Sequence, residues 1–371
     1  MKKNSVIAMG AFAFLATATI AGCSSGGDGG TDATPAASST ASATGGDAMA
    51  AGDARACVIL PDAASSPRWE NGDRPALEKA ITDAGFEVDI QNAQGDTGQY
   101  ATIAEQQMTG GCDVMLLVDL QGAAQSVTEN AQAEGIPVIA YDRPIPGADY
   151  YVSFDNFHVG ELEGQTVVDG LEANGVAAAD AVVVYIGGDP ADGNAAMFHD
   201  GADSVMKAAG ITPAAEPPGL WDGEHSATVF EQALTDLDGK VDAVWAANDT
   251  NAAGVITILD KNGLTVPVSG QDASVAGLQN VLLGKQGGTV YKPFQVEAQD
   301  ASNLAIQLLN GETPTIEKSL DDGTPFIAAT PILVTKDNVQ VVIDDGNASY
   351  DEICAGDVKA ACDEAGLTAG A

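Results

Sequence analysis

The sequence predicts an α/β protein with two doubly wound lobes, each built on a parallel sheet. Three observations support this fold class. From residue 54 onward, short apolar segments alternate with helical patterns, as in consecutive βαβ units. Most helical patterns end near a glycine, and the next apolar segment follows within a few residues. The alternation restarts after residue 155, and a chain of 371 residues is long enough for two such domains.

The first half of this pattern predicts five strands and three helices. Apolar runs such as CVIL and DVMLLV predict buried strands, because parallel strands are covered on both faces. The expected strands are 56–61, 86–93, 112–120, 137–142 and 150–155, and the expected helices are 74–85, 100–111 and 123–135.

The second half repeats the pattern with more helices. The expected strands are 179–188, 241–249, 267–272 and 288–293, and the expected helices are 160–175, 194–210, 226–239, 251–263, 274–284 and 295–311. One sheet holding all the strands would be large, so two lobes of similar size fit the length better.

The first 23 residues predict export and a membrane anchor. A short basic start, MKKNS, precedes an apolar run that is too short and wrongly flanked for a stable membrane span. The run ends in Ile20-Ala21-Gly22-Cys23, which resembles a bacterial lipobox with Cys23 as the lipidated residue. The alternative is an ordinary secretory signal with a chance cysteine. Residues 24–53 are rich in Gly, Ser, Thr and Ala and predict a flexible tether. The expected location is therefore the outer face of the cytoplasmic membrane.

The net charge limits which macromolecular partners are expected, and the cysteine content limits the disulfides and metal sites. There are 15 Lys and Arg against 53 Asp and Glu, a formal net charge of −38, which argues against nucleic acid or an anionic membrane surface as a partner. An exported protein can form disulfides, and the four other cysteines allow three pairings; Cys57 with Cys112 and Cys354 with Cys362 are the plausible ones. With three histidines and no C-x-x-C spacing, neither a metal site nor a cofactor is expected.

Polar side chains end four of the predicted strands. They are Asp142-Arg143 after 137–142, Asn248-Asp249 at the end of 241–249, Gln271-Asp272 at the end of 267–272, and Lys292 within 288–293. Ligands of open parallel sheets bind outside the carboxyl ends of the strands, so we expect these groups to line a cleft. Two alternatives remain: Asn248-Asp249 can cap the following helix, and Asp142-Arg143 can form a structural ion pair.

Such a lining suits a ligand rich in hydroxyl groups. Carboxylates, amides and the planar arginine fork exchange hydrogen bonds with hydroxyls, and the apolar faces of a sugar ring stack on aromatic rings. Trp69 and Trp221 lie in segments between strands and helices and are candidate stacking platforms, whereas Trp245 lies inside 241–249 and is expected in the core.

A resemblance to a known family rests on four motifs: AYDRPIPGADYYVSFDNFHVGELEGQ (140–165), AANDTNAAG (246–254), SGQDASVAG (269–277) and TVYKPFQ (289–295). They resemble the periplasmic D-xylose-binding proteins of ABC importers, within the type I solute-binding proteins for ribose and galactose. The resemblance covers residues 56–340 and implies two lobes that the chain crosses three times, with a sugar held between them. The implied lobes are 55–157 plus 293–328, and 158–292 plus 329–371.

The resemblance also implies the site. The family's sugar contacts fall on nine positions: Arg68, Trp69, Asp142, Arg143, Asn194, Trp221, Asn248, Asp272 and Lys292. Trp69 and Trp221 are expected on either side of the sugar ring. The sequence departs from the family pattern in two places: the segment after Trp69 is one residue longer, and the surroundings of Trp221 match more loosely.

The expected function is that of a monomeric sugar-binding lipoprotein, which delivers D-xylose to an ABC permease driven by its ATPase. The alternatives are a binding protein for ribose, arabinose, glucose or galactose, or a sugar sensor for a membrane receptor. No enzyme is expected, because the chain lacks the G-x-S-x-G, H-E-x-x-H and G-x-x-x-x-G-K-[ST] patterns.

Overall fold

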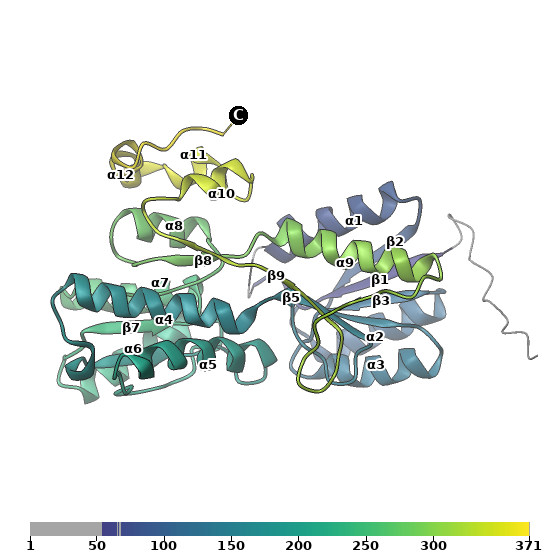
Figure 1. Cartoon of the computed structure of the whole chain (residues 1–371), viewed down its shortest axis with the longest axis horizontal. Coiled ribbons are helices and arrows are strands. Elements are labelled where there is room, and N and C mark those ends of the chain that lie inside the picture. The colour runs from purple at the N-terminus through teal and green to yellow at the C-terminus, as the bar shows by residue number, and fades with distance from the viewer. Residues whose placement is uncertain (1–53, 65, 67, 371) are drawn as a thin grey trace, which may run out of the picture. The chain divides into compact units, whose positions relative to one another are not determined.

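One six-stranded sheet and two two-stranded sheets, all flanked by helices, organise the structure, a computed structural model (Figure 1). It describes residues 54–64, 66 and 68–370. The predicted signal peptide 1–23 with Cys23 and the predicted tether 24–53 lie outside the described residues.

The first sheet has six strands, all parallel. In spatial order they are β2 (Glu87–Asn92), β1 (Arg55–Leu60), β3 (Val114–Leu117), β4 (Val138–Tyr141), β5 (Tyr150–Phe154) and β9 (Phe326–Ala329). The five strands expected before residue 156 are confirmed, and β9 is an addition from far along the chain.

Helices cover both faces of this sheet, as the doubly wound prediction requires. The helices are α1 (Arg74–Asp83) and α9 (Phe294–Leu309) on one face, and α2 (Thr97–Thr109) and α3 (Ala123–Ala133) on the other. Side chains of a strand point alternately to the two faces: Val58 of β1 packs under α1 and α9, whereas Ile59 packs under α2 and α3. We call this sheet with its four helices the first lobe.

The other four strands form two short sheets, which isolated bridges through Val268 and Gln271 link. One sheet pairs β6 (Val183–Ile186) with β7 (Ala243–Ala246) in parallel, and the other pairs β8 (Thr289–Tyr291) with the antiparallel β10 (Ile332–Val334). The helices that cover them are α4 (Asn156–Ala173) and α5 (Gly193–Ala208) on one face, and α6 (Gly223–Asp236) and α7 (Asp249–Asn262) on the other. We call these two sheets, with these helices and α8 (Val275–Leu282), the second lobe.

The prediction of a strand at 267–272 was wrong. The structure has only isolated bridges there, from Val268 to Val244 and from Gln271 to Val290. The hydroxyl of Ser269 accepts from the backbone N–H of Ala246 at 2.9 Å and donates to its carbonyl at 3.1 Å. The side chain of Ser269 thus bonds to the N–H and the carbonyl of Ala246, which the main chain of a neighbouring strand would otherwise use.

Helices α4 and α5 lie so close that glycine is required between them. A Cβ atom at Gly160 would lie 2.0 Å from the carbonyl oxygen of Phe198, and one at Gly201 would lie 2.0 Å from that of Phe157. The close contact fixes the start of α5, which carries Asn194, against the start of α4.

The chain passes between the lobes three times, between β5 and α4, between β8 and α9, and between β9 and β10. The implied three-segment connection is therefore confirmed. After β10, three short helices pack on α8 and β8: α10 (Gln340–Asp344), α11 (Tyr350–Ile353) and α12 (Lys359–Glu364). No helix or strand was predicted from the sequence beyond residue 311.

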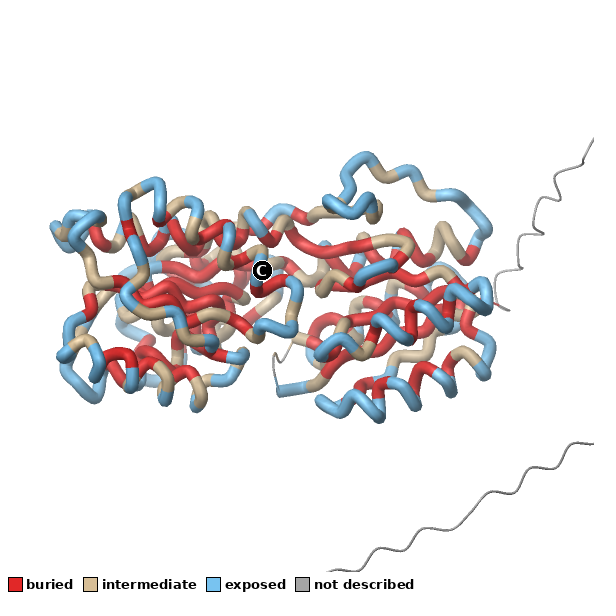
Figure 2. Tube along the Cα trace, turned by 90° about the horizontal axis from the view of Figure 1, so that it is seen from below, coloured by how far each residue is buried: buried red, intermediate tan, exposed pale blue. Residues whose placement is uncertain are grey.

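Buried residues follow the strands and the inner helix faces of each lobe (Figure 2). Trp245 is fully buried in the second lobe, which confirms its assignment to the core. Among the described residues, no helix is long and apolar enough to span a membrane.

Two disulfides join Cys57 to Cys112 and Cys354 to Cys362. The first closes a loop with a sequence separation of 55 and the second a loop of 8. Loop-closure entropy predicts that replacing the first pair by alanine lowers the free energy of unfolding by about 4 kcal/mol, against about 2.5 kcal/mol for the second pair. Urea unfolding of the two double variants measures this. Equal losses, or a larger loss for the tail pair, would contradict the ranking.

Candidate functional site

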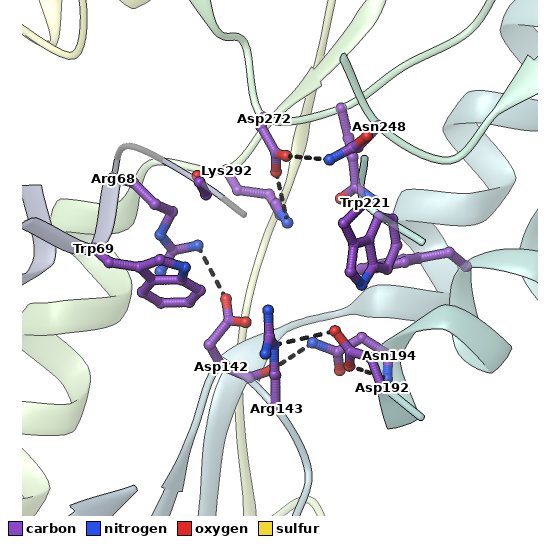
Figure 3. A pocket seen from close by; sticks show the side chains of 13 residues that line it. Arg68, Trp69, Asp142, Arg143, Asp192, Asn194, Trp221, Asn248, Asp272 and Lys292 are labelled. Atoms are coloured by element: carbon purple, nitrogen blue, oxygen red, sulfur yellow. Dashed lines mark hydrogen bonds and ion pairs between the residues drawn. The ribbon is translucent and has the colours of Figure 1, made fainter. Parts of the chain in front are cut away.

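A pocket between the two lobes contains all nine residues that the resemblance implied (Figure 3). Its volume is about 410 Å3, part of it open to solvent. The lining residues are Ser66, Arg68, Trp69, Asp142, Arg143, Asp192, Asn194, Phe198, Trp221, Asn248, Gln271, Asp272 and Lys292. The structure brings together residues separated by more than two hundred positions.

The pocket lies at the carboxyl ends of strands in both lobes, as expected for a doubly wound fold. Asp142 follows β4 with φ +64°, and Asp272 has φ +94°. Residues other than glycine rarely adopt this left-handed region, although Asp does so more readily than most. In both cases the backbone N–H bonds to a neighbouring strand, that of Asp142 to Val152 and that of Asp272 to Val290.

Arg68 is the centre of a buried charge cluster. Its guanidinium donates two hydrogen bonds to Asp73, at 2.7 and 2.8 Å, one to Asp142 at 3.0 Å and one to Glu297 at 2.5 Å. Asp73 and Glu297 are fully buried, and the hydroxyl of Tyr141 also donates to Asp73. Within the described part of the chain, four of the five N–H groups of Arg68 are thus bonded to carboxylates.

The cluster keeps Arg68 charged. Burial alone would lower the pKa of Arg68, but attraction from Asp73, Glu297 and Asp142 outweighs it and raises the pKa well above its usual value. Burial raises the pKa of Glu297 well above its usual range despite the nearby guanidinium.

The segment that follows Arg68 forms a π-helical turn, Trp69–Asp73, which the sequence analysis took for a loop. The N–H of Arg74 donates to the carbonyl of Trp69, five residues earlier. A π-turn accommodates one more residue than an α-turn. Within this turn Arg68 and Asp73 lie within hydrogen-bond distance of each other.

Arg143 connects the two lobes. Its Nε lies 3.1 Å from a carboxylate oxygen of Asp192 in the second lobe, and it donates to the carbonyl of Asp119 in the first at 2.9 Å. Asp142 and Arg143 therefore each pair with other residues, Asp142 with Arg68 and Arg143 with Asp192, rather than with each other.

Asn194 of the second lobe also contacts the first lobe, through the main-chain carbonyl of Asp142. Its amide donates to the carbonyl of Asp142 at 2.8 Å, and that carbonyl also accepts from the hydroxyls of Tyr151 and Ser153. Asn156, at the start of α4, donates to the amide oxygen of Asn194 at 2.9 Å. Because all these groups are buried, the position of Asp142 depends on both lobes.

The second lobe contributes a second group of polar side chains. Lys292 lies 2.9 Å from Asp272, and the amide of Asn248 lies 3.5 Å from the other carboxylate oxygen. Burial would lower the pKa of Lys292, but Asp272 and Asp142 outweigh it and raise the pKa. Asn248 also caps α7 by accepting from the N–H of Asn251 at 2.8 Å, so the capping alternative and the pocket assignment both hold.

Trp69 and Trp221 lie on opposite sides of the pocket (Figure 3). The guanidinium of Arg68 lies 4.5 Å from the ring centre of Trp69. Trp221 has φ +56° and packs against Gly188, where a Cβ atom would lie 2.2 Å from its ring. Within the described residues, the buried indole N–H of Trp221 donates no hydrogen bond.

Three lining residues were not identified from the sequence: Ser66, Asp192 and Phe198. Gln271, which the polar strand end indicated, does line the pocket. Phe198 had a signal, because it is four positions after Asn194 on α5 and hence on the same helix face. Asp192 caps α5, which is its ordinary role at a helix start, and nothing local distinguishes it.

The lining suits the binding of a polar ligand. No group of three or more His, Cys, Asp or Glu suited to a metal ion occurs in the part of the chain that the structure describes. The pocket presents hydrogen-bonding groups between two aromatic faces, the arrangement that holds a small polyhydroxylated molecule.

A family model described as a periplasmic binding protein domain matches residues 57–313. The chain belongs to the periplasmic binding protein family. A D-xylose-binding periplasmic protein of Escherichia coli is 36% identical over 293 residues, covering 75% of this chain and 86% of the relative. A multiple sugar-binding periplasmic receptor of Rhizobium radiobacter is 30% identical, covering 81% and 92%.

Solved structures of periplasmic binding proteins agree with this membership. An ABC transporter solute-binding protein of Clostridium phytofermentans, with bound β-D-glucose, superposes with a TM-score of 0.73 at 27% identity and covers 81% of this chain and 99% of its own. A carbohydrate-transporter counterpart from Chloroflexus aurantiacus, in complex with D-glucose, has a TM-score of 0.70 at 27% identity, covering 80% and 97%. This periplasmic binding protein is a solute-binding protein and not an enzyme.

The Arg68 cluster predicts a strong effect on stability. Arg68→Met leaves three carboxyls without their counter-charge, which should lower the free energy of unfolding by about 3–5 kcal/mol. Lys79→Met, which removes an exposed ion pair with Asp83, is the control and should change it very little. Chemical unfolding at neutral pH measures both. Similar small losses in the two variants would mean that the cluster does not organise the first lobe.

Proposed function

We propose that the protein binds D-xylose between its two lobes and delivers it to an ABC permease powered by a cytoplasmic ATPase. The observation that carries the proposal is the pair Trp69 and Trp221, which face each other across a pocket lined by Asp142, Asn248 and Asp272. An aromatic face on each side suits the apolar faces of a pyranose ring, and the carboxylates and amides suit its equatorial hydroxyls. The relative named for D-xylose supports the choice of sugar.

Each polar group has a role in this proposal. Asp142 and Asp272 accept hydrogen bonds from sugar hydroxyls, because their cationic partners hold them in place and leave oxygen lone pairs available. Arg143 and Lys292 donate to ring and hydroxyl oxygens. Asn194, Asn248 and the remaining N–H of Arg68 complete the set. A hexose such as D-glucose is the second candidate, since solved neighbours carry that ligand.

We further propose that the described arrangement is the closed form. The implied lobes, 55–157 plus 293–328 and 158–292 plus 329–371, would open by a hinge at the three crossings. The support is direct contact between the lobes beside the pocket, from Arg143 to Asp192 and from Asp142 to Asn194. Closure would exclude water and bury the ligand.

The relatives named as periplasmic proteins support an extracytoplasmic location for this chain. We propose that Cys23 carries the lipid that anchors it to the outer face of the cytoplasmic membrane. The tether 24–53 would keep a monomeric binding domain within reach of the permease. Mass spectrometry of the protein extracted from membranes, before and after Cys23→Ala, tests the anchor.

A ligand panel tests the proposed function. D-xylose, D-ribose, L-arabinose, D-glucose and D-galactose are added to residues 54–371, and unfolding and binding heat are measured. At a hundred times its dissociation constant, D-xylose should stabilise the protein by about 2.7 kcal/mol. Trp69→Ala and Asp272→Ala should each weaken binding at least about tenfold. Asp337→Ala, an exposed carboxylate far from the pocket, is the control. A preference for another sugar would change the proposed substrate, and no response to any sugar would overturn the proposal.

Closure predicts a second effect at Gly193, the first residue of α5. A Cβ atom there would lie 2.7 Å from Cγ of Pro144 in the first lobe. Gly193→Ala should therefore hinder closure and weaken sugar binding about tenfold or more, while the free protein stays as stable, since alanine is a good helix residue. The control is Gly98→Ala at the start of α2, which does not line the pocket. Unchanged affinity, with an unchanged ligand-induced contraction in small-angle scattering, would contradict the closed-form assignment.

A further inference from the structure

Asp249 lies behind the pocket and does not line it. It is the first residue of α7, directly after Asn248, and its relative exposure is 3%. One carboxylate oxygen accepts from the N–H of Ser274 at 2.8 Å and from its hydroxyl at 3.0 Å. The other accepts from the amide of Gln286 at 2.7 Å, and the backbone N–H of Asp249 donates to the carbonyl of Gln271 at 3.0 Å. The residue is thus bound to both ends of the short segment that carries Asp272.

That segment has an uncommon conformation. Asp272 has φ +94° and Ala273 has φ +45°, two successive positive values without a glycine. Such conformations persist only where the surroundings hold them. The N–H of Asp272 is held by the carbonyl of Val290, and the N–H of Ala273 by the hydroxyl of Thr289. Asp249 holds the next residue, Ser274, and so supports the third successive position.

Two glycines leave room for the carboxylate of Asp249. A Cβ atom at Gly277 would lie 2.0 Å from one oxygen of Asp249, and a Cβ atom at Gly270 would lie 2.5 Å from the other. These glycines flank the segment, and neither has a positive φ that would itself require glycine. Contacts with Asp249 at Gly277, and with both Asp249 and the amide nitrogen of Gln286 at Gly270, account for the absence of a side chain at both positions.

The ionised carboxylate of Asp249 destabilises the fold where it lies. Burial first, and then the negative charge of Asp272, raise the pKa of Asp249 to about 7, against the lowering effect of bonds from Gln286, Ser274 and Thr289. The other charged groups near this part of the lobe are Glu163 on α4 and Lys292 after β8. A group whose pKa is raised in the folded state favours folding less as the pH rises from its unfolded value to about 7. Ionised Asp249 therefore reduces stability.

We propose that Asp249 is a positioning residue: through Ser274 and Gln286 it holds segment 270–274 in the conformation that presents Asp272 to the ligand. The inference rests on the proposed function, because Asp272 needs a ligand to act upon. Asp249 itself makes no contact with the sugar. Its effect on binding is separate from its effect on stability, and the two have opposite signs.

The protonation state of Asp249 gives a readout that a purely structural residue would lack. Ionised, it accepts from three donors. Protonated, one oxygen carries a hydrogen, although the groups that face it, the N–H and hydroxyl of Ser274 and the amide of Gln286, donate to the ionised form. Sugar affinity should therefore fall as the pH drops through about 7, whereas the contribution of Asp249 to fold stability rises over the same interval.

Calorimetric titration of residues 54–371 with D-xylose between pH 5.5 and 8.5 tests this. At pH 8, Asp249→Ala should weaken binding about tenfold while the free protein unfolds at the same or higher denaturant concentration. Asp249→Asn keeps the shape without the titration, so its affinity should vary less with pH than that of the unaltered protein. Asp260→Ala, on the exposed face of the same helix, is the matched control.

The outcomes separate this inference from the proposed function. No binding of any sugar by the unaltered protein overturns both. If the unaltered protein binds a sugar, and Asp249→Ala and Asp249→Asn bind it with the same affinity and pH profile, only the positioning role is overturned. If Asp249→Ala does not fold, Ser274→Ala is the second variant. It removes the hydroxyl that donates to Asp249 and should weaken sugar binding about threefold. Unchanged affinity in Ser274→Ala would contradict the inference.

Discussion

The constraint on which the pocket depends is that a buried arginine must be surrounded by its counter-charges. Arg68 meets this constraint with three carboxyl groups from three different elements. Asp73 lies at the start of α1, Asp142 after β4, and Glu297 in the first turn of α9. A buried network of this kind is weak evidence for net stability, but removing one partner is costly, so the geometry is tightly specified. The position of Asp142 in the pocket follows from it.

The second lobe solves the corresponding problem with the backbone. Asp272 is placed by a left-handed conformation and by hydrogen bonds to β8, and it is neutralised by Lys292. Asp249 supports this segment from behind at a cost in stability. Both lobes therefore present a carboxylate that is already oriented and paired before a ligand arrives, which reduces the entropy lost on binding.

The regular parts of this arrangement were predictable, and the exceptions have local causes. Apolar runs and helical periodicity identified most elements up to residue 311, because each βαβ unit repeats the same short-range pattern. The expected strand at 267–272 failed because the hydroxyl of Ser269 replaces ladder bonds. The polar ends of the strands indicated a cleft, but the partners of Arg68 were hidden. They lie 5, 74 and 229 residues away, and no local pattern connects them.

A crystal structure of residues 54–371 with D-xylose is the most direct test. The sugar ring should lie between Trp69 and Trp221, with its hydroxyls bonded to Asp142, Asn248 and Asp272. The guanidinium of Arg68 should stay on Asp73 and Glu297 and give the sugar a single hydrogen bond. A sugar bound outside the two tryptophans, or an Arg68 released from its carboxylates to enclose the ligand, would contradict the claim that the pocket is assembled in advance by the buried charge cluster.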